Sequence, residues 1–176
     1  SEEIRRVILT HHHGDHLGQA QGLRDAGADL EVLAHEAEIQ SIEQFSEDRE
    51  EDIAATNALF GEYGVPEELL ARQTEMRRRW LREGPPLCEP TRVDRALRAG
   101  DRIGFKEFEL EVIHAPGHTA GHLLLHEPRT RTLLTGDHLM GDAVPFTETW
   151  YETGTPDPRD PLARRPRFRG LPSYLA

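Results

Sequence analysis

The sequence is poor in features that several classes of protein require. Its 176 residues contain one cysteine, Cys88, so a disulfide within the chain and a site with several thiolate ligands are both excluded. No run of about 18 apolar residues is present, and the first residues lack the basic-then-apolar pattern of a secretion signal. These absences predict a cytoplasmic protein in a reducing environment, without a membrane partner.

The balance of charge bears on the class of ligand. The chain has 32 acidic and 21 basic residues and a net charge of -11, which repels polyanions such as nucleic acids. One basic cluster (Arg77, Arg78, Arg79 and Arg82) lies among acids in a segment of helical composition, which predicts a solvated helix face. The composition therefore favours a small-molecule substrate over a nucleic-acid partner, and it leaves open whether the chain forms an oligomer.

The order of patterns along the chain predicts one α/β (α+β) domain over residues 1–176. Residues 4–9 are β-prone, a helix is predicted over 16–26, and residues 30–34 form a second strand. This succession is typical of a β-α-β unit with parallel strands. Residues 36–92 are rich in Glu, Gln, Arg, Ala and Leu at helical spacing, which predicts a helical insertion of two or three helices.

The pattern becomes β-like again after the insertion. Phe108, Leu110 and Val112 alternate with polar residues, as on a strand with one buried face. Residues 123–125 are three consecutive leucines, as on a strand that is buried on both faces. These segments predict a sheet that other elements cover.

The segment after Asp142 has a different composition. It is rich in proline, arginine and aspartate, which favours an extended loop over strands or helices. A new helix is predicted to start at Pro172 and Ser173.

The strongest chemical signal is the segment Thr-His-His-His-Gly-Asp-His-Leu-Gly, which begins at Thr10. Side chains two apart on an extended chain share a face, so His11, His13 and Asp15 are predicted to project together while His12 points away. Packing does not explain such a cluster. Neutral imidazole nitrogens and carboxylate oxygens suit zinc and, less selectively, iron or manganese. The segment therefore predicts a metal site.

Two segments far along the chain extend this pattern. Residues 117–122 read Gly-His-Thr-Ala-Gly-His, and residues 134–137 read Leu-Thr-Gly-Asp. Together with His-x-His-x-Asp-His at residues 11–16, they resemble, in order, the three motifs of the metallo-β-lactamase superfamily. The resemblance implies an αββα sandwich of two sheets between helices, with metals at the sheet edges.

The resemblance also implies two divalent cations, most simply zinc, held by six side chains. The set for one cation is His11, His13 and His118, and the set for the other is Asp15, His16 and the bridging Asp137. Two cations about 3.5 to 4 Å apart would acidify a shared water, and the hydroxide would attack a carbonyl carbon. Asp15 would orient this nucleophile or accept its proton, which makes it the predicted catalytic residue.

Two features usual in the family are missing from the sequence. Several strands normally precede the first motif, and a further His ligand normally follows the bridging Asp. The last histidine here is His138, which directly follows Asp137 and is expected to point the opposite way. The chain is therefore expected to be a fragment, truncated at both ends, of a single metallo-β-lactamase-like domain.

The predicted activity is hydrolysis of a thioester, a lactone or a related carbonyl compound. In this the chain resembles glyoxalase II, a hydroxyacylglutathione hydrolase. Three alternatives stay open: a phosphodiesterase of the same superfamily, a mononuclear iron dioxygenase that acts on persulfides, and an inactive metal-binding fragment. The net charge disfavours the first, and the presence of both Asp15 and His16 favours two metals over the single iron of the second.

Overall fold

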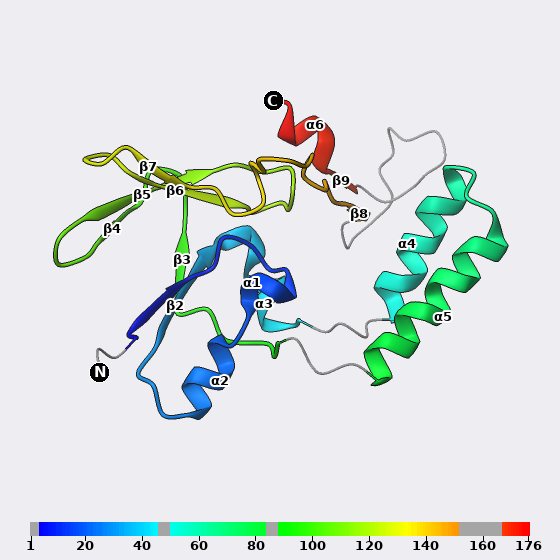
Figure 1. The fold of residues 1–176 in the computed structure, drawn as a ribbon, viewed down its shortest axis with the longest axis horizontal. Helices are drawn as coiled ribbons and strands as arrows, with labels where there is room; N and C mark the ends of the chain where they lie inside the picture. The colour runs from blue at the N-terminus through cyan, green and yellow to red at the C-terminus, as the bar shows by residue number, and fades with distance from the viewer. Residues whose placement is uncertain (1–3, 46–49, 84–87, 152–166) are drawn as a thin grey trace. The chain divides into compact units, whose positions relative to one another are not determined.

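The computed structural model describes residues 4–45, 50–83, 88–151 and 167–176 (Figure 1). The chain divides into two compact units, which are described separately. The first consists of Ser1–Phe45, Cys88–Thr149 and Arg169–Ala176, and the second of Ser46–Leu87 and Trp150–Phe168. The predicted histidine motifs all fall in the first unit.

The first unit opens with a parallel sheet. Its strands are β1 (Arg6–Ile8), β2 (Glu31–His35) and β3 (Arg95–Leu97), in the order β1-β2-β3. β1 pairs with β2 in parallel, with Val7 opposite Val32, and β2 pairs with β3 in parallel. The β-α-β unit predicted for the first residues is thereby confirmed.

The helix predicted over residues 16–26 is instead two short helices, α1 (Gly14–Leu17) and α2 (Ala20–Asp25). Gly18 ends the first of them with a φ of 55°, a left-handed conformation that glycine adopts without steric cost. The prediction of one continuous helix was therefore wrong. Beyond β2, a short 3-10 helix η1 (Glu36–Glu38) leads into α3 (Ile39–Glu43).

The second sheet of this unit is antiparallel. Its strands are β4 (Arg102–Gly104), β5 (Glu109–His114), β6 (Leu123–Glu127) and β7 (Thr132–Leu134), in the order β4-β5-β6-β7. The three leucines of β6 are all buried, as the sequence predicted. Phe108 differs from the expected pattern, because it precedes β5 and is 42% exposed.

Alternate residues of β2 enter two different cores. Val32 and Ala34 pack with Leu17 and Ile42 on the helical side of the parallel sheet. Leu33 faces the other way and belongs to the core between the two sheets, whose further members include Leu97, Ile103, Val112 and Leu123. The layers of the first unit are therefore helices, parallel sheet and antiparallel sheet, which is an α/β sandwich.

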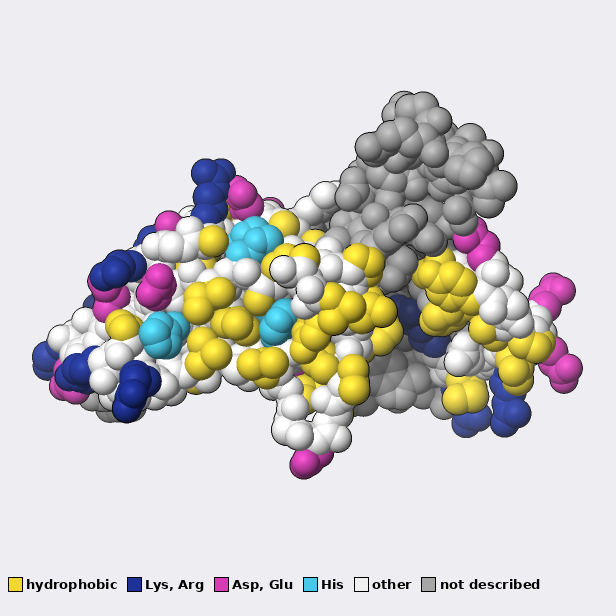
Figure 2. Space-filling model, turned by 90° about the horizontal axis from the view of Figure 1, so that it is seen from above, with side chains coloured by type: hydrophobic (Ala, Val, Ile, Leu, Met, Phe, Trp, Pro, Cys, Tyr) yellow, Lys and Arg dark blue, Asp and Glu magenta, His cyan; other side chains and the backbone are white. Residues whose placement is uncertain are grey.

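The outer face of the antiparallel sheet carries apolar side chains. Ile113 and Leu133 are each 38% exposed, and they alternate with residues that face the core between the sheets. Figure 2 looks from above and shows hydrophobic and histidine side chains gathered on this face. The sheet is thus covered on one face by the described residues and open on the other.

The tail adds two short strands that the sequence did not predict, β8 (Thr149–Tyr151) and β9 (Arg167–Arg169), which pair with each other. The final helix, α6 (Gly170–Tyr174), begins two residues before the predicted start. Residues 143–148 have no regular secondary structure, as predicted, and residues 152–166 lie outside the described residues.

The second unit contains two helices, α4 (Glu50–Glu62) and α5 (Glu67–Glu83). They lie side by side in Figure 1, and Asn57 Nδ2 donates a hydrogen bond to Thr74 Oγ1 at 2.8 Å. Gly64, with a φ of 83°, lies in the turn between them. The helices confirm the helical character predicted for this stretch. No helix among the described residues is long and apolar enough to cross a membrane.

Leu123→Ala tests the core between the two sheets. Leu123 is fully buried, so we expect the substitution to lower the free energy of unfolding by about 2 to 5 kcal/mol. Leu133→Ala, on the neighbouring strand and 38% exposed, is the matched control and should cost much less. Urea denaturation of both variants measures the difference, and equal losses would contradict the assigned layers.

Candidate metal centre

The predicted site residues gather where strands of both sheets end. His11 and His13 follow β1, His118 lies between β5 and β6, and Asp137 follows β7. Next to the site, Leu123 N donates a hydrogen bond to Thr10 O at 2.9 Å, which joins the start of β6 to the loop after β1. The fold thus brings together residues that lie more than a hundred positions apart in the sequence.

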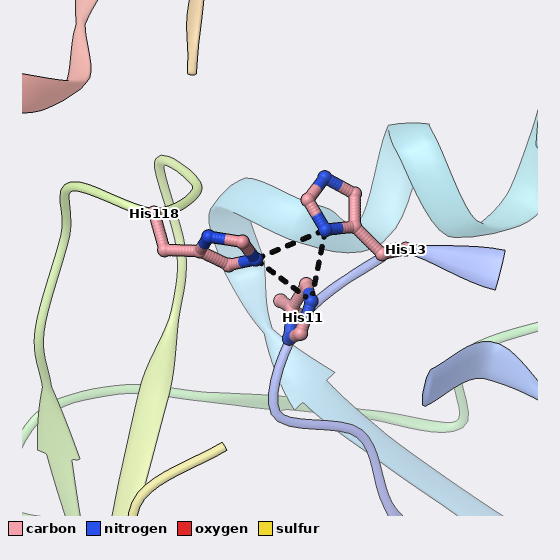
Figure 3. A group of neighbouring side chains, drawn as sticks. All are labelled: His11, His13 and His118. Atoms are coloured by element: carbon pink, nitrogen blue, oxygen red, sulfur yellow. Dashed lines mark hydrogen bonds between the residues drawn. The ribbon is translucent and has the colours of Figure 1, made fainter. Parts of the chain in front are cut away.

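Three ring nitrogens converge at the centre of the site (Figure 3). His11 Nε2 lies 3.1 Å from His13 Nδ1, and His118 Nε2 lies 3.2 Å from His11 Nε2 and 3.0 Å from His13 Nδ1. His11 and His118 are buried, with 0% and 3% of their surfaces exposed. Three nitrogens that bind one zinc ion tetrahedrally are about 3.3 Å apart, so the spacing suits a metal.

The outer nitrogens of two rings decide which atoms face the centre. His13 Nε2 is 2.7 Å from Glu148 Oε1, and His118 Nδ1 is 2.6 Å from Phe146 O. A carbonyl, and equally an ionised carboxylate, can only accept, so both outer nitrogens carry the hydrogen and both inner nitrogens present lone pairs. At most one hydrogen, on His11 Nε2, is then available for the three nitrogen–nitrogen contacts. The three nitrogens are therefore better suited to binding a cation between them than to hydrogen bonding with one another.

The surroundings keep the imidazoles of His11 and His118 neutral. Burial, helped by the neighbouring rings of His13 and His16, lowers the pKa of His11 far below its ordinary value. Burial also lowers the pKa of His118, although the carbonyl of Phe146 opposes this shift. Neutral imidazole is the form that binds metals, so the site is prepared for a cation near neutral pH.

A second group lies beside the first. His11, His16 and Asp137 each offer a ligand atom, and these atoms lie within 4.8 Å of one another. The two oxygens of Asp137 point to different histidines, since Oδ1 is 3.1 Å from His16 Nε2 and Oδ2 is 3.7 Å from His118 Nε2. The carboxylate of Asp137 thus spans the space between the two groups.

Asp15 is placed differently from the geometry that the sequence predicted. Helix α1 begins at Gly14, so the extended alternation that aligns His11 with His13 ends before Asp15. The Asp15 side chain is 74% exposed, and its Oδ2 lies 3.8 Å from His16 Nε2. The structure therefore brings Asp15 near the second group, on its solvent side, but not into either compact set of ligand atoms.

Two glutamates of the site were missed by the sequence reasoning. Glu38 Oε2 accepts a hydrogen bond from His12 N at 3.0 Å and also contacts His12 Nδ1. His12 lies outside the convergence of His11, His13 and His118, but it does not simply point away as predicted, because it offers a ligand atom within 4.8 Å of those of His13 and Glu148. Glu148 contacts His13 and, at 3.5 Å, His12 Nε2. Glu38 follows the carboxyl end of a parallel strand, where ligand-binding residues often lie, and that position could have revealed it. Glu148 lies in the proline-rich tail and carries no comparable signal.

The His122 ring lies next to the rings of His11 and His118, and the His138 ring lies next to that of His122. His122 is fully buried, its Nε2 accepts a hydrogen bond from Asp137 N at 3.2 Å, and burial lowers its pKa to about 3. Gly136 fits against this ring, because a Cβ at residue 136 would lie 2.8 Å from His122 Nε2. His138 joins no ligand group among the described residues, and its ring packs against Tyr174. These histidines support the backbone around Asp137.

Comparisons with known proteins agree with this geometry. The family model described as the metallo-beta-lactamase superfamily matches residues 1–168. A hydroxyacylglutathione hydrolase from Thermosynechococcus vestitus is 27% identical over 138 residues, which cover 78% of this chain and 36% of that protein. A hydroxyacylglutathione hydrolase from Fuscovulum blasticum is 46% identical over 48 residues, or 27% of this chain and 19% of that protein.

A solved structure is similar over most of the chain. It is a metallo-beta-lactamase family protein from Thermus thermophilus, with a TM-score of 0.61 and 28% identity. The similarity covers 83% of this chain and 44% of that protein. The chain therefore spans less than half the length of the Thermosynechococcus vestitus and Thermus thermophilus proteins, although each match covers most of this chain.

The buried histidines predict a pH dependence of stability. His11 and His122 have lowered pKa values in the folded chain, so below about pH 6.5 the unfolded chain binds protons that the folded chain does not. The sign is therefore a loss of stability on acidification. With a chelator present, we expect these two groups to lower the free energy of unfolding by about 2 to 3 kcal/mol from roughly pH 7.5 to 5.5, and the lowered pKa values of His35, His118 and His138 add to the fall.

Urea denaturation at several pH values measures this slope. His122→Gln removes one of the contributing groups, so the fall in the free energy of unfolding between roughly pH 7.5 and 5.5 should be smaller by about 1.4 kcal/mol in that variant. A slope that is the same in the variant and the unaltered chain would contradict the assignment of His122 as a buried neutral imidazole.

Proposed function

The chain belongs to the metallo-β-lactamase superfamily, and on this premise we propose that it is a metal-dependent hydrolase with two divalent cations, most simply zinc. The observation that carries the proposal is the position of Asp137. One of its oxygens faces His16 and the other faces His118, so a single carboxylate lies between two groups of nitrogen ligands. This is the arrangement that a bridging ligand requires.

Six side chains would hold the two cations. We assign His11, His13 and His118 to one cation, and Asp15, His16 and the bridging Asp137 to the other. When bound, the two cations supply Lewis-acid polarisation of a carbonyl oxygen and lower the pKa of water. The chain's own contribution is to present neutral nitrogens in fixed tautomers, through the contacts of His13 with Glu148 and of His118 with Phe146 O.

Asp15 is proposed as the catalytic carboxylate. Its side chain is 74% exposed, so water and substrate can reach its oxygens, unlike those of the buried Glu38. A carboxylate at this position can orient the attacking water and accept its proton. Its position next to His16 also allows it to contribute an oxygen ligand after a small rotation of the side chain.

The proposed substrate is a thioester, a lactone or a related small carbonyl compound. The named relatives are hydroxyacylglutathione hydrolases, which supports a thioester first. The loop after Asp137 exposes apolar side chains, and the carbonyl of Phe146 ties this loop to His118. We propose that this loop contacts the acyl group of the substrate.

One observation supports a second candidate. His11, His16 and Asp137 form a set of two histidines and one carboxylate, which is the ligand type of mononuclear iron oxygenases. The convergence of His13 and His118 on His11 favours the hydrolase, because a single iron would leave these nitrogens without a function. Metal content separates the two: two equivalents favour the hydrolase, and one equivalent of iron with oxygen consumption favours the oxygenase.

Asp137→Ala tests the proposed bridging role. We expect metal content to fall below two equivalents and hydrolysis to fall more than about a hundredfold. Removing a residue that only hydrogen-bonds to a metal ligand already lowers metal affinity or activity roughly 10- to 100-fold, and a ligand itself should matter more. Plasma mass spectrometry measures the metals, and a panel of thioesters, lactones, β-lactams and phosphodiesters measures turnover.

Asp29→Ala is the matched control, because Asp29 is an exposed carboxylate in the turn before β2, at the amino end of that strand, whereas the site lies at the carboxyl ends of the strands. It should keep both the metals and the activity. Unchanged turnover in Asp137→Ala would refute the bridging role, and hydrolysis of phosphodiesters alone would refute the proposed substrate class.

A further inference from the structure

Glu38 is a buried carboxylate that the proposed ligand set does not use. Only 1% of its surface is exposed, although a charged side chain in the interior costs several kcal/mol unless partners compensate it. It ends the short helix η1, directly after β2. A carboxylate in such a position needs a structural or functional reason.

Both oxygens of Glu38 are bound, and they are bound to different loops. Oε2 accepts from His12 N at 3.0 Å and contacts His12 Nδ1. Oε1 accepts from Thr119 Oγ1 at 2.8 Å and from Gly121 N at 2.5 Å. His12 stands between the ligands His11 and His13 in the sequence, whereas Thr119 follows the ligand His118 directly.

The chemistry of these contacts requires an ionised carboxylate. Burial alone would raise the pKa of Glu38, but hydrogen bonds from His12, Thr119 and Gly121 outweigh burial and leave the pKa below its ordinary value. A glutamine could not replace it fully, because its amide nitrogen would face donors on one of the two loops.

The surrounding space is shaped for this side chain. A Cβ at residue 121 would lie 2.7 Å from Glu38 Cγ and 2.9 Å from His35 Nδ1, so only glycine leaves room for the carboxylate there. Glu38 thus packs closely between the two loops, against the backbone of Gly121.

We propose that Glu38 is a positioning residue of the metal centre: it holds the loop of His11 and His13 and the loop of His118 at the separation that lets their ring nitrogens bind one cation. The inference rests on the proposed function only in requiring that His11, His13 and His118 bind a metal. Glu38 touches neither the substrate nor the cation, and it acts through the backbone and side chains of the two loops.

Cobalt(II) binding to the full chain, followed through the visible spectrum, tests the proposal without measuring turnover. We expect Glu38→Gln to weaken the binding of cobalt about 10- to 100-fold and to change the shape of the absorption bands. Glu38→Asp keeps the charge but is one methylene shorter, so it should also weaken binding. Equal binding by Glu38→Asp and the unaltered chain would mean that charge alone suffices, and would overturn the positioning role.

Two further variants separate the effect from general destabilisation. Glu127→Gln is the matched control, since Glu127 is also a buried carboxylate, but it binds Arg129 N and Thr130 N in the turn after β6. It should leave cobalt binding within about twofold, while any loss of stability appears in urea denaturation. Thr119→Val removes one donor to Glu38 and keeps the side-chain shape, so it should weaken cobalt binding in the same direction as Glu38→Gln, but less.

The outcomes distinguish the two proposals. Normal affinity and an unchanged spectrum in a folded Glu38→Gln chain would overturn the role of Glu38 and leave the hydrolase proposal intact. Weakened binding by Glu38→Gln in a chain that hydrolyses no member of the substrate panel would support Glu38 and refute the hydrolase. An unaltered chain that binds no cobalt would overturn both.

Discussion

The structure depends on the close approach of ring nitrogens from His11, His13 and His118, which carry too few hydrogens to hydrogen-bond with one another. Glu148 and the carbonyl of Phe146 take the hydrogens of His13 and His118 on the outer side of each ring. The inner nitrogens are then left as lone pairs at separations of 3.0 to 3.2 Å. Lone pairs repel at this distance, so the arrangement is costly for the chain alone and favourable around a cation. The surrounding fold has to supply the stability that holds it.

The two sheets supply that stability. Leu33 and Leu123 belong to different sheets and pack in the same core, which fixes the strand ends that carry the histidine loops. The backbone contact between Leu123 and Thr10 then ties the sheets together one residue before His11. The helical layer adds Glu38, which reaches the site because η1 directly follows the carboxyl end of β2. Elements from all three layers of the first unit therefore converge on one small volume.

The sequence predicted the parts of this arrangement that depend on local patterns. The parallel pairing of β1 and β2 and the burial of the leucines at residues 123–125 follow from hydrophobic periodicity, and the gathering of His118 and Asp137 follows from motif order. The break at Gly18 and the start of α1 at Gly14 were missed, since helical periodicity does not show where a short helix is interrupted. Glu38 and Glu148 were missed because their partners lie 26 and 135 positions away, and no short-range pattern records such contacts.

The separation of the ligands along the chain links metal occupancy to the integrity of both sheets. His11 and His118 are 107 positions apart, so opening either sheet pulls the nitrogens away from each other and releases whatever cation they hold. By mass action, a free cation at 100 times its dissociation constant would add about 2.7 kcal/mol to the stability of the folded state. A cell that is starved of the metal would then carry a less stable protein that proteases degrade sooner, so the amount of this protein would itself follow the supply of metal.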